Sequence, residues 1–213
     1  MTSSIPLYFT ETLDKERLDI LPTLSHFTQR WFYLAGGTAL AIIFGHRESI
    51  DFDFFCKNDF DTRTLFAFCQ EIFEWKHIEK IMESKNTLWI TIDAIKISFF
   101  TLKNELLEPL IHTEYIDIAS VPDIAAMKLW AIQNRATNKD YIDLACIIDH
   151  IGLRNTLQSF SQKHGDIVSD SQLLKSLLYF EDIENEPLKL KKHQKNWEET
   201  KLYLQKIIKA DFS

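Results

Sequence analysis

The spacing of apolar and polar residues divides the chain into a first half of short strand-like runs and helices and a second half that is almost wholly helical. Strands are predicted at 31–35, 49–55, 77–83, 87–92 and 95–100, and helices in the same half at 12–30, 38–45 and 61–75. Beyond it, helices are predicted near 121–134, 139–151, 153–163, 170–180 and 195–210. The pattern therefore predicts an α/β (α+β) fold, with a mixed sheet flanked by helices and followed by a C-terminal helical bundle.

The change of pattern also predicts how the chain is divided. We expect residues 1–104 to form an α/β core and residues 105–213 a helical C-terminal domain that completes a cleft. An acidic stretch at 181–186, followed by Pro187 and a basic run at 189–195, predicts an exposed connection before the last helix.

Composition limits the classes of protein that fit. Hydrophobic residues make up 46% of the 213 residues, with only 5 Gly and 5 Pro, which is typical of a globular protein with a real core. The net charge of −7 argues against broad nonspecific binding of nucleic acid. The three widely spaced cysteines, Cys56, Cys69 and Cys146, predict buried free thiols instead of a zinc site.

Hydropathy predicts the location of the chain. No apolar run reaches the roughly 20 residues that a membrane helix needs, so no membrane partner is expected. The first residues lack a basic segment followed by an apolar one, and we therefore expect no secretion signal and a cytoplasmic protein.

A pair of glycines, Gly36 and Gly37, follows the first predicted strand and opens the next predicted helix. At such a position backbone N–H groups approach an anion closely, and the helix N-terminus adds a partial positive charge, so phosphate is the natural ligand. A glycine pair alone is more often a plain strand-to-helix turn.

Two carboxylates follow in the alternating run Ser49-Ile50-Asp51-Phe52-Asp53-Phe54-Phe55. On a regular strand Asp51 and Asp53 share one face, while Ile50, Phe52 and Phe54 pack on the other. Alone, the pair is explained by an exposed strand face. Next to a glycine turn it favours a metal site beside a phosphate site, the two halves of a nucleoside-triphosphate site.

These residues resemble those of a known family. The order of strand, Gly36-Gly37-Thr38 helix and Asp51-Phe52-Asp53 strand resembles the nucleotidyltransferase fold of the DNA polymerase beta superfamily. The segments LAGGTALAIIFGHRESIDFDFF and VPDIAAMKLWAIQNRATNKDYIDL are similar to those of AbiEii/AbiGii nucleotidyltransferase-like toxins, and the likeness extends to LLYFEDIENEP and the Trp197 helix.

The resemblance implies transfer of an NMP from an NTP to a hydroxyl acceptor with Mg²⁺ or Mn²⁺, residues 1–104 being the nucleotidyltransferase core. It implies a toxin of a toxin–antitoxin or phage-defence system, an antitoxin protein as partner, and tRNA as the acceptor of some members. The basic run at 189–195 offers tRNA a limited contact.

Roles for individual residues also follow from the resemblance. Asp51 and Asp53 are expected to hold the metal as catalytic residues, and Lys128 to stabilise the developing charge. Gly36, Gly37 and Thr38 are expected to hold the triphosphate, with Arg47 and Ser49 lining the site. His46 is explained equally well as a hydrogen-bonded loop histidine.

The predicted helix 121–134 places Lys128 and Arg135 in the middle of an apolar arc. Buried cations need a partner, which is either a core carboxylate or an anionic ligand. On the next helix Lys139, Asp140 and Asp143 lie on a polar stripe, where Lys139 and Asp143 have the spacing of a surface ion pair. The resemblance implies that all five residues border the nucleotide.

One position departs from the family pattern. Ser98 stands where these enzymes have a third carboxylate, and serine is a weak metal ligand that cannot act as a base near neutral pH. Asp93 falls on the opposite strand face, in a predicted turn, whereas Lys96 shares the face of Ser98. Ser98 therefore keeps open a pseudoenzyme that binds a nucleotide or a partner. A transferase with a small acceptor such as an antibiotic also stays open, because the sequence does not show the acceptor cleft.

Overall fold

The computed structural model describes residues 7–211; residues 1–6, which include part of the start interpreted as lacking a secretion signal, and 212–213 lie outside it. Across the described residues, seven strands form one mixed sheet in the order β3-β4-β5-β2-β1-β7-β6. The β2–β5 and β1–β7 pairs are parallel and the other neighbours are antiparallel. The predicted α/β class with a mixed sheet and flanking helices is confirmed.

The strands and helices have the following bounds in chain order. The strands are β1 Tyr33–Ala35, β2 Phe52–Cys56, β3 Ile78–Ser84, β4 Thr87–Ile92, β5 Ile95–Thr101, β6 Ile111–His112 and β7 Asp117–Ile118. The helices are α1 Phe9–Thr12, α2 Lys15–Thr28, α3 Gly36–Phe44, α4 Thr62–Ile72, α5 Val121–Asn134, α6 Asn138–Ile151, α7 Leu153–His164, α8 Asp170–Leu177 and α9 Trp197–Asp211.

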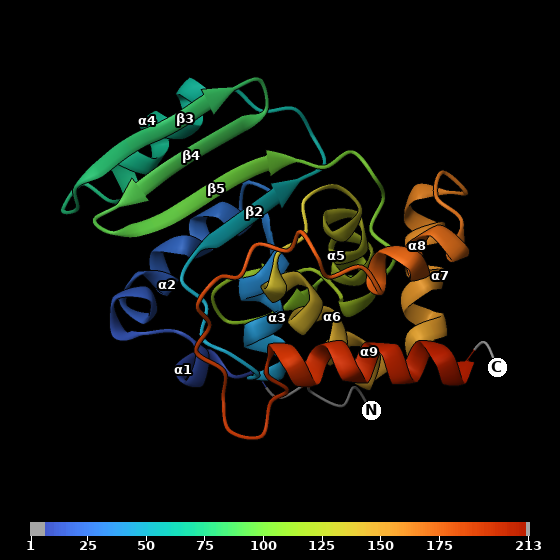
Figure 1. Cartoon of the computed structure of the whole chain (residues 1–213). Helices are drawn as coiled ribbons and strands as arrows, with labels where there is room; N and C mark the ends of the chain where they lie inside the picture. The colour runs from blue at the N-terminus through green and yellow to red at the C-terminus, as the bar shows by residue number, and fades with distance from the viewer. Residues whose placement is uncertain (1–6, 212–213) are drawn as a thin grey trace, which may run out of the picture.

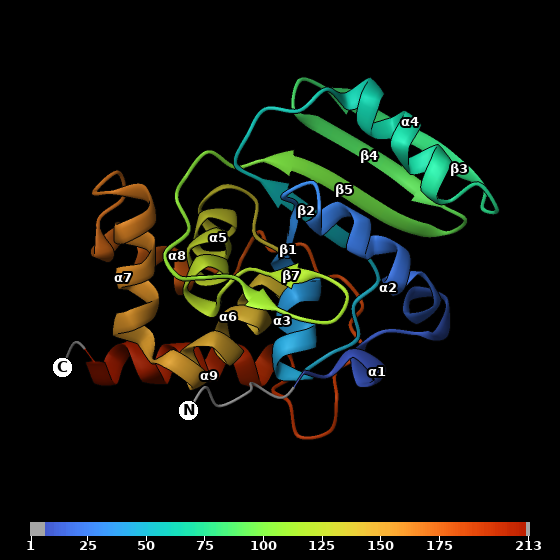
Figure 2. The ribbon, with the colours of Figure 1, turned by 180° about the vertical axis from the view of Figure 1, so that it is seen from behind.

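The two central strands carry the alternation that the sequence predicts. Phe52, Phe54 and Phe99 are fully buried, and Phe54 and Phe99 pack against the Phe27 ring of α2. Figure 2 shows α2 and α4 lying over this face of the sheet. The opposite face of β2 and β5 carries Asp53, Lys96 and Ser98 together with two aromatic residues, Phe55 and Phe100.

The expected strand at 49–55 is shorter than predicted. β2 begins at Phe52, and Ile50, predicted to pack inward, is 60% exposed. Its carbonyl instead accepts a hydrogen bond from Arg17 Nε, and the amide of Ser49 donates to the carbonyl of Thr12. Residues 49–51 are therefore held against the N-terminal helices by these hydrogen bonds and not by pairing with a neighbouring strand.

The sheet continues beyond residue 104. β7 pairs with β1 in parallel, with Leu34 opposite Ile118, and β6 pairs with β7. Neither strand was among the predicted elements, because two residues are too short to show a period of two. The division into 1–104 and 105–213 stays a prediction, since the second segment adds strands as well as helices.

The connection between α8 and α9 crosses the front of the molecule (Figure 1). We call residues 184–191 the strap. The backbone amide of Asn138 donates to the carbonyl of Glu184 (3.0 Å). The backbone amide of Glu48 donates to the carbonyl of Lys189 (3.0 Å). The predicted exposed connection is thus joined by backbone hydrogen bonds both to the start of α6 and to the loop after α3.

Two further expectations concern membrane-spanning segments and thiols. No helix in the described part of the chain is long and apolar enough to cross a membrane. Cys56, Cys69 and Cys146 are free thiols; the first two are buried and Cys146 is half-buried.

Candidate active site

A cleft of about 340 Å³ lies between the polar face of β2 and β5 and the helices α5 and α6. Ten of the residues selected from the sequence line it: Gly36, Gly37, Thr38, Ser49, Asp51, Asp53, Lys128, Arg135, Lys139 and Asp140. Arg47 and Asp143 are buried beneath this lining. Segments far apart in the sequence therefore meet at one site.

The N-terminus of α3 opens into the cleft. Gly36 has a φ of +72°, a left-handed conformation that favours glycine. The residue before the helix, Ala35, supplies no side-chain cap, so the first N–H groups are left for another acceptor. Thr38 Oγ1 lies 2.7 Å from Ser49 Oγ and donates to the carbonyl of Asp51. These bonds fix the glycine turn beside the carboxylates.

Gly37 is required by what lies under it. A Cβ at this position would come within 2.2 Å of Arg47 Nη2. The Arg47 guanidinium cannot move aside freely, because it is buried and bonded to Asp143 through two nitrogens. The second glycine of the pair thus lets α3 lie directly on this arginine.

The sheet side of the cleft carries two neighbouring carboxylates. Asp51 and Asp53 are half-buried, and Asp53 lies directly opposite Ser98 in the β2–β5 ladder. Burial, followed by the charge of Asp51, raises the pKa of Asp53, while Ser98, Lys128 and Lys96 oppose the rise. The nearby cations therefore do not fully compensate the negative charge of the Asp51–Asp53 pair.

These residues fit one magnesium ion. Within the described residues no group of three His, Cys, Asp or Glu side chains is placed to hold a metal, in keeping with Ser98 at the third position. Mg²⁺ is commonly held by one or two carboxylates together with substrate phosphates. Asp51 and Asp53 supply that donor set, and the raised pKa of Asp53 shows the charge that a cation would neutralise.

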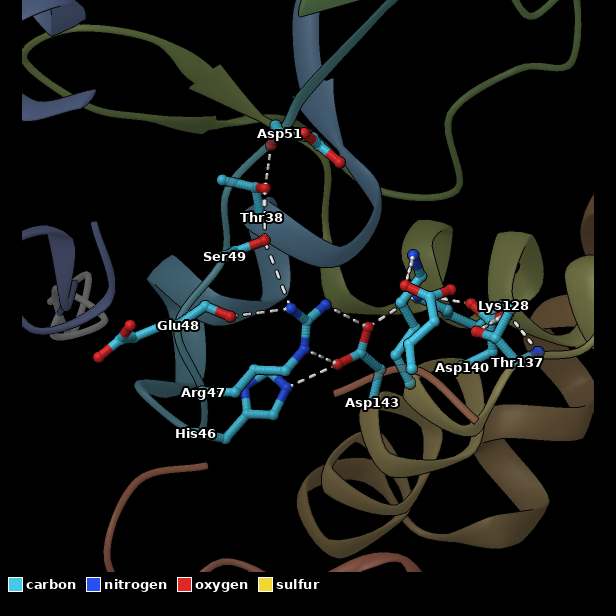
Figure 3. Close-up of polar contacts among 12 residues, drawn as sticks. Thr38, His46, Arg47, Glu48, Ser49, Asp51, Lys128, Thr137, Asp140 and Asp143 are labelled. Atoms are coloured by element: carbon cyan, nitrogen blue, oxygen red, sulfur yellow. Dashed lines mark hydrogen bonds and ion pairs between the residues drawn. The ribbon is translucent and has the colours of Figure 1, made fainter. Parts of the chain in front are cut away.

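The helical side of the cleft rests on a buried ion-pair network (Figure 3). Asp143 accepts from Arg47 Nε (2.7 Å) and Nη2 (2.9 Å), and His46 Nε2 lies 2.7 Å from its Oδ1. Lys128 Nζ lies 2.7 Å from Asp143 and 2.9 Å from Asp140. Lys128 is buried, as predicted, and of the two kinds of partner left open the structure shows core carboxylates.

The network decides the protonation of its members. Burial favours neutral Asp143, but the charges of Arg47 and Lys128 outweigh it and hold the pKa of Asp143 well below its ordinary value. Burial would lower the pKa of Lys128, yet Asp143 and then Asp140 raise it. Lys128 therefore carries a fixed positive charge at the edge of the cleft.

One prediction for α5 is wrong, and one alternative that the spacing left open for α6 is not realised. Arg135 is not on a buried face: α5 ends at Asn134, and Arg135 follows it as an exposed residue with a φ of −158°. Lys139 does not pair with Asp143 but with Glu186 of the strap, at 2.9 Å. Both cations nevertheless line the cleft.

The remaining expectations at the site are met in part. Asp93 lies in the β4–β5 turn, as predicted, and it also pairs with Lys76. Lys96 lines the cleft and lies 4.7 Å from the ring centroid of Trp89. His46 is bonded through Nε2 only; its Nδ1 is buried without a partner among the described residues.

Sequence reasoning missed part of the lining. Phe55, Trp89, Phe100 and Met127 add apolar surface to the cleft, and Glu184 and Glu186 of the strap also line it. The aromatic residues share the strand face of Asp53 and Ser98, so the strand period could have identified them. The acidic stretch of the strap was visible, but no pattern shows what a connection touches.

The mixed sheet, the helix opened by two glycines and the carboxylate pair define a protein of the nucleotidyltransferase fold. The structure is similar to that of MenT4, a nucleotidyltransferase toxin from Mycobacterium tuberculosis H37Rv, with a TM-score of 0.54 and 17% identity over 89% of this chain and 82% of that chain. It is equally similar to ANT(2″)-Ia in complex with adenylyl-2″-tobramycin, with a TM-score of 0.54 and 10% identity over 73% of this chain and 100% of that chain.

The chain belongs to the family described as nucleotidyl transferase AbiEii toxin, Type IV TA system, whose profile matches residues 19–210. An uncharacterized protein of Aquifex aeolicus (strain VF5) is 37% identical over 183 residues, covering 84% of this chain and 86% of that protein. The resemblance drawn from the motifs is confirmed.

Proposed function

We propose that the protein is a nucleotidyltransferase that moves an NMP from an NTP to a hydroxyl acceptor and releases pyrophosphate. One observation carries the proposal: the open N-terminus of α3, the Asp51–Asp53 pair and the cation Lys128 line the same cleft. An anion site, a cation site and a fixed positive charge are what transfer of a phosphoryl group needs.

Each group has a separate task. Gly36, Gly37 and Thr38 present backbone N–H groups to the triphosphate, and Lys128 faces the charge that develops on it. Asp51 and Asp53 hold Mg²⁺ (or Mn²⁺), which when bound neutralises phosphate charge. Arg135 and Lys139 extend the cationic side, whereas Arg47 and Asp143 act from beneath by fixing Lys128 and the glycine turn.

The biological role follows family membership. We propose a toxin of a toxin–antitoxin system, acting in the cytoplasm and countered by an antitoxin, with tRNA among the acceptors to be tested. The basic run at 189–195 contributes less than its composition suggests. Lys189 and Lys191 both pair with Glu48, and Lys195 pairs with Asp149.

A second candidate function rests on Ser98. Because Ser98 lies directly opposite Asp53, this chain has a hydroxyl where a third carboxylate would complete the site. A protein that binds NTP and Mg²⁺ without transferring the nucleotide fits the same cleft.

Calorimetry tests the proposal before any acceptor is known. Each of the four NTPs is titrated with and without Mg²⁺ into wild type and Asp51→Ala/Asp53→Ala. We expect Mg²⁺-dependent binding that the double substitution abolishes. The matched control, Asp19→Ala/Asp166→Ala, removes two exposed carboxylates outside the cleft lining and should bind as wild type does.

Two results would contradict the proposal. Absence of NTP binding to wild type would remove the substrate, and equal binding by the Asp51→Ala/Asp53→Ala variant would place the nucleotide elsewhere. Incorporation of label from α-labelled NTP into tRNA or a small acceptor then separates the transferase from the second candidate, which binds NTP and labels nothing.

A further inference from the structure

Lys96 of β5 lines the cleft as a cation that no carboxylate holds. Its side chain makes no hydrogen bond or ion pair within residues 7–211, and its Nζ lies 4.7 Å from the ring centroid of Trp89. By contrast, Lys128 and Lys139 on the helical side each pair with a carboxylate. Arg135 also lacks such a pair among the described residues, but it follows α5 on the helical side. On the sheet side, therefore, Lys96 has a positive charge to offer a ligand.

The register of the sheet places Lys96 beside the position of the missing carboxylate. The strands β4, β5 and β2 are neighbours in the sheet (Figure 1). Ser98 of β5 lies opposite Asp53 on one side and opposite Trp89 on the other. Lys96 comes two residues before Ser98 and shares its face, and it reaches the ring of Trp89 diagonally across the ladder. Asp53, Trp89 and Lys96 thus flank the position that Ser98 occupies.

The donors at this position suit one divalent ion and not two. In two-metal sites for phosphoryl transfer the ions lie about 4 Å apart and stabilise both the attacking and the leaving oxygen. Asp51 and Asp53 supply two carboxylates, whereas the Ser98 hydroxyl supplies no negative charge. Within the described residues no group of three His, Cys, Asp or Glu side chains is placed to hold a metal. The second positive charge of such a site has to come from elsewhere.

Lys96 acts electrostatically on the same carboxylates. Burial, followed by the charge of Asp51, raises the pKa of Asp53, and the charge of Lys96 is among those that oppose the rise. The ammonium is therefore near enough to compensate part of the negative charge that a second ion would compensate. An ammonium also carries three donors that suit phosphate oxygens.

We propose that Lys96 takes the place of a second metal ion, so that the protein uses one divalent ion and one lysine. The inference rests on the proposed transferase function. The ammonium donates to a nonbridging oxygen of the α-phosphate of the NTP, where it stabilises the charge of the transition state. The acceptor oxygen bonds to the α-phosphorus while the bond to the oxygen that bridges to the β-phosphate breaks, and pyrophosphate leaves with the electron pair. The hydroxyl proton passes to water, because an ammonium has no lone pair to accept it.

Counting bound Mn²⁺ tests the inference without any acceptor. Electron paramagnetic resonance measures free Mn²⁺ with protein in excess over the α,β-methylene analogue of ATP, CTP, GTP or UTP, none of which can be cleaved at the α-phosphate. We expect one Mn²⁺ per bound nucleotide in wild type. Ser98→Asp/Lys96→Met removes the ammonium and adds the third carboxylate, and we expect two Mn²⁺ per bound nucleotide in this variant.

Lys96→Met alone tests the contact with the α-phosphate. Methionine keeps an apolar stem beside Trp89 and removes the charge. We expect the affinity for the methylene analogues, measured by calorimetry with Mg²⁺, to fall about tenfold, the scale of one hydrogen bond to a charged group. The affinity for pyrophosphate, which lacks an α-phosphate, should stay unchanged. This variant decides the question even where the double variant does not fold.

Two matched variants serve as controls. Lys96→Arg keeps the positive charge and should retain most of the affinity for the analogues. Lys85→Ala removes an exposed lysine between β3 and β4, outside the cleft lining, and should bind as wild type does. Thermal unfolding of each variant verifies that it is folded.

The outcomes distinguish this inference from the proposed function. One Mn²⁺ in wild type, with a loss in Lys96→Met that is limited to nucleotides, supports it. Two Mn²⁺ in wild type overturn it, as do one Mn²⁺ in the folded double variant, unchanged nucleotide affinity in Lys96→Met, and an equal loss for pyrophosphate. In all four of these cases wild type still binds metal and nucleotide, so the proposed function stands. Absence of nucleotide binding by wild type is a separate result, which removes the proposed function and this inference with it.

Discussion

The two sides of the cleft treat charge in opposite ways. On the sheet side, Asp51 and Asp53 are half-buried neighbours, and burial and repulsion raise the pKa of Asp53. On the helical side, Asp143 is fully buried, yet Arg47 and Lys128 hold its pKa well below the ordinary value. One side lacks positive charge and needs a ligand to supply it, whereas the other is complete without a ligand. The same residue type therefore serves binding on one side and stability on the other.

The largest effect on stability should come from a substitution in the ion-pair network of the helical side. Asp143→Asn leaves Arg47 and Lys128 buried without their main counter-charge, and we expect the free energy of unfolding to fall by about 3–5 kcal/mol. Asp51→Asn is the matched substitution on the open side and should change it by about 1 kcal/mol or less. Urea unfolding of both variants measures the difference, and equal losses would refute the distinction between the two sides.

The second prediction adds charge to the open side. Ser98→Asp places a third carboxylate opposite Asp53, and we expect the affinity for Mg²⁺ in the presence of NTP to rise about tenfold, because ligand charge strengthens the binding of hard cations. Ser98→Asn has a similar size without the charge and should bind as wild type does. A rise in metal-dependent transfer would show that the missing carboxylate limits activity; unchanged Mg²⁺ affinity would place the metal away from β5.

The third prediction uses pH. The raised pKa of Asp53 means that the folded chain binds this proton more tightly than the unfolded chain, so stability falls as pH rises from the ordinary carboxyl range through the raised value. Asp53→Asn removes this penalty and should be more stable than wild type at neutral pH by about 1 kcal/mol, the scale of one like-charge contact. At acid pH, where Asp53 is protonated, the unfolding free energies of the two proteins should become equal.

The contribution of Asp143 to stability depends on pH in the opposite direction. Its lowered pKa contributes stability above the ordinary carboxyl range, and that stability is lost as pH falls toward the lowered value. Unfolding free energies across an acid-to-neutral pH series measure both trends. An Asp53→Asn variant less stable than wild type at neutral pH would show that Asp53 is a structural residue.

The smallest effect concerns the strap. Lys139 and Glu186 are each about one-third exposed, at 36% and 34%, and such a pair is worth at most about 1 kcal/mol. Glu186→Gln frees Lys139 for phosphate, and we expect NTP affinity to rise about two- to fivefold by calorimetry. Glu181→Gln removes an exposed charge outside the cleft lining and should have no effect. Weaker NTP binding by Glu186→Gln would assign Glu186 itself to the nucleotide.

Local patterns predicted the sheet side well. The period of two along β2 and β5 sets Asp53 and Ser98 on one face and Phe52, Phe54 and Phe99 on the other, as the ladder shows. The glycine pair likewise predicted the turn into α3. These features depend on residues close in sequence, where strand geometry and glycine conformation leave few alternatives.

The helical side depends on partners that are remote in sequence. Asp143 has the spacing to pair with Lys139, but it pairs with Lys128, His46 and Arg47, the last of them 96 residues away. Lys139 pairs instead with Glu186, 47 residues away. Periodicity put Arg135 on the buried face because it cannot locate the helix end at Asn134. Which of several cations reaches a buried carboxylate is decided by tertiary packing, and the sequence pattern does not encode it locally.

The position of the strap in the chain has a consequence for synthesis. Ribosomes deliver the glycine turn and the Asp51–Asp53 pair first. Glu184 and Glu186, which line the cleft, and the hydrogen bonds between residues 189–191 and the loop after α3 follow only after all seven described strands and α5–α8. Domains form as their residues emerge. A nascent chain therefore carries an open half-site until the strap has been synthesised, and the cleft is completed only after most of the sheet and of α5–α8 has emerged.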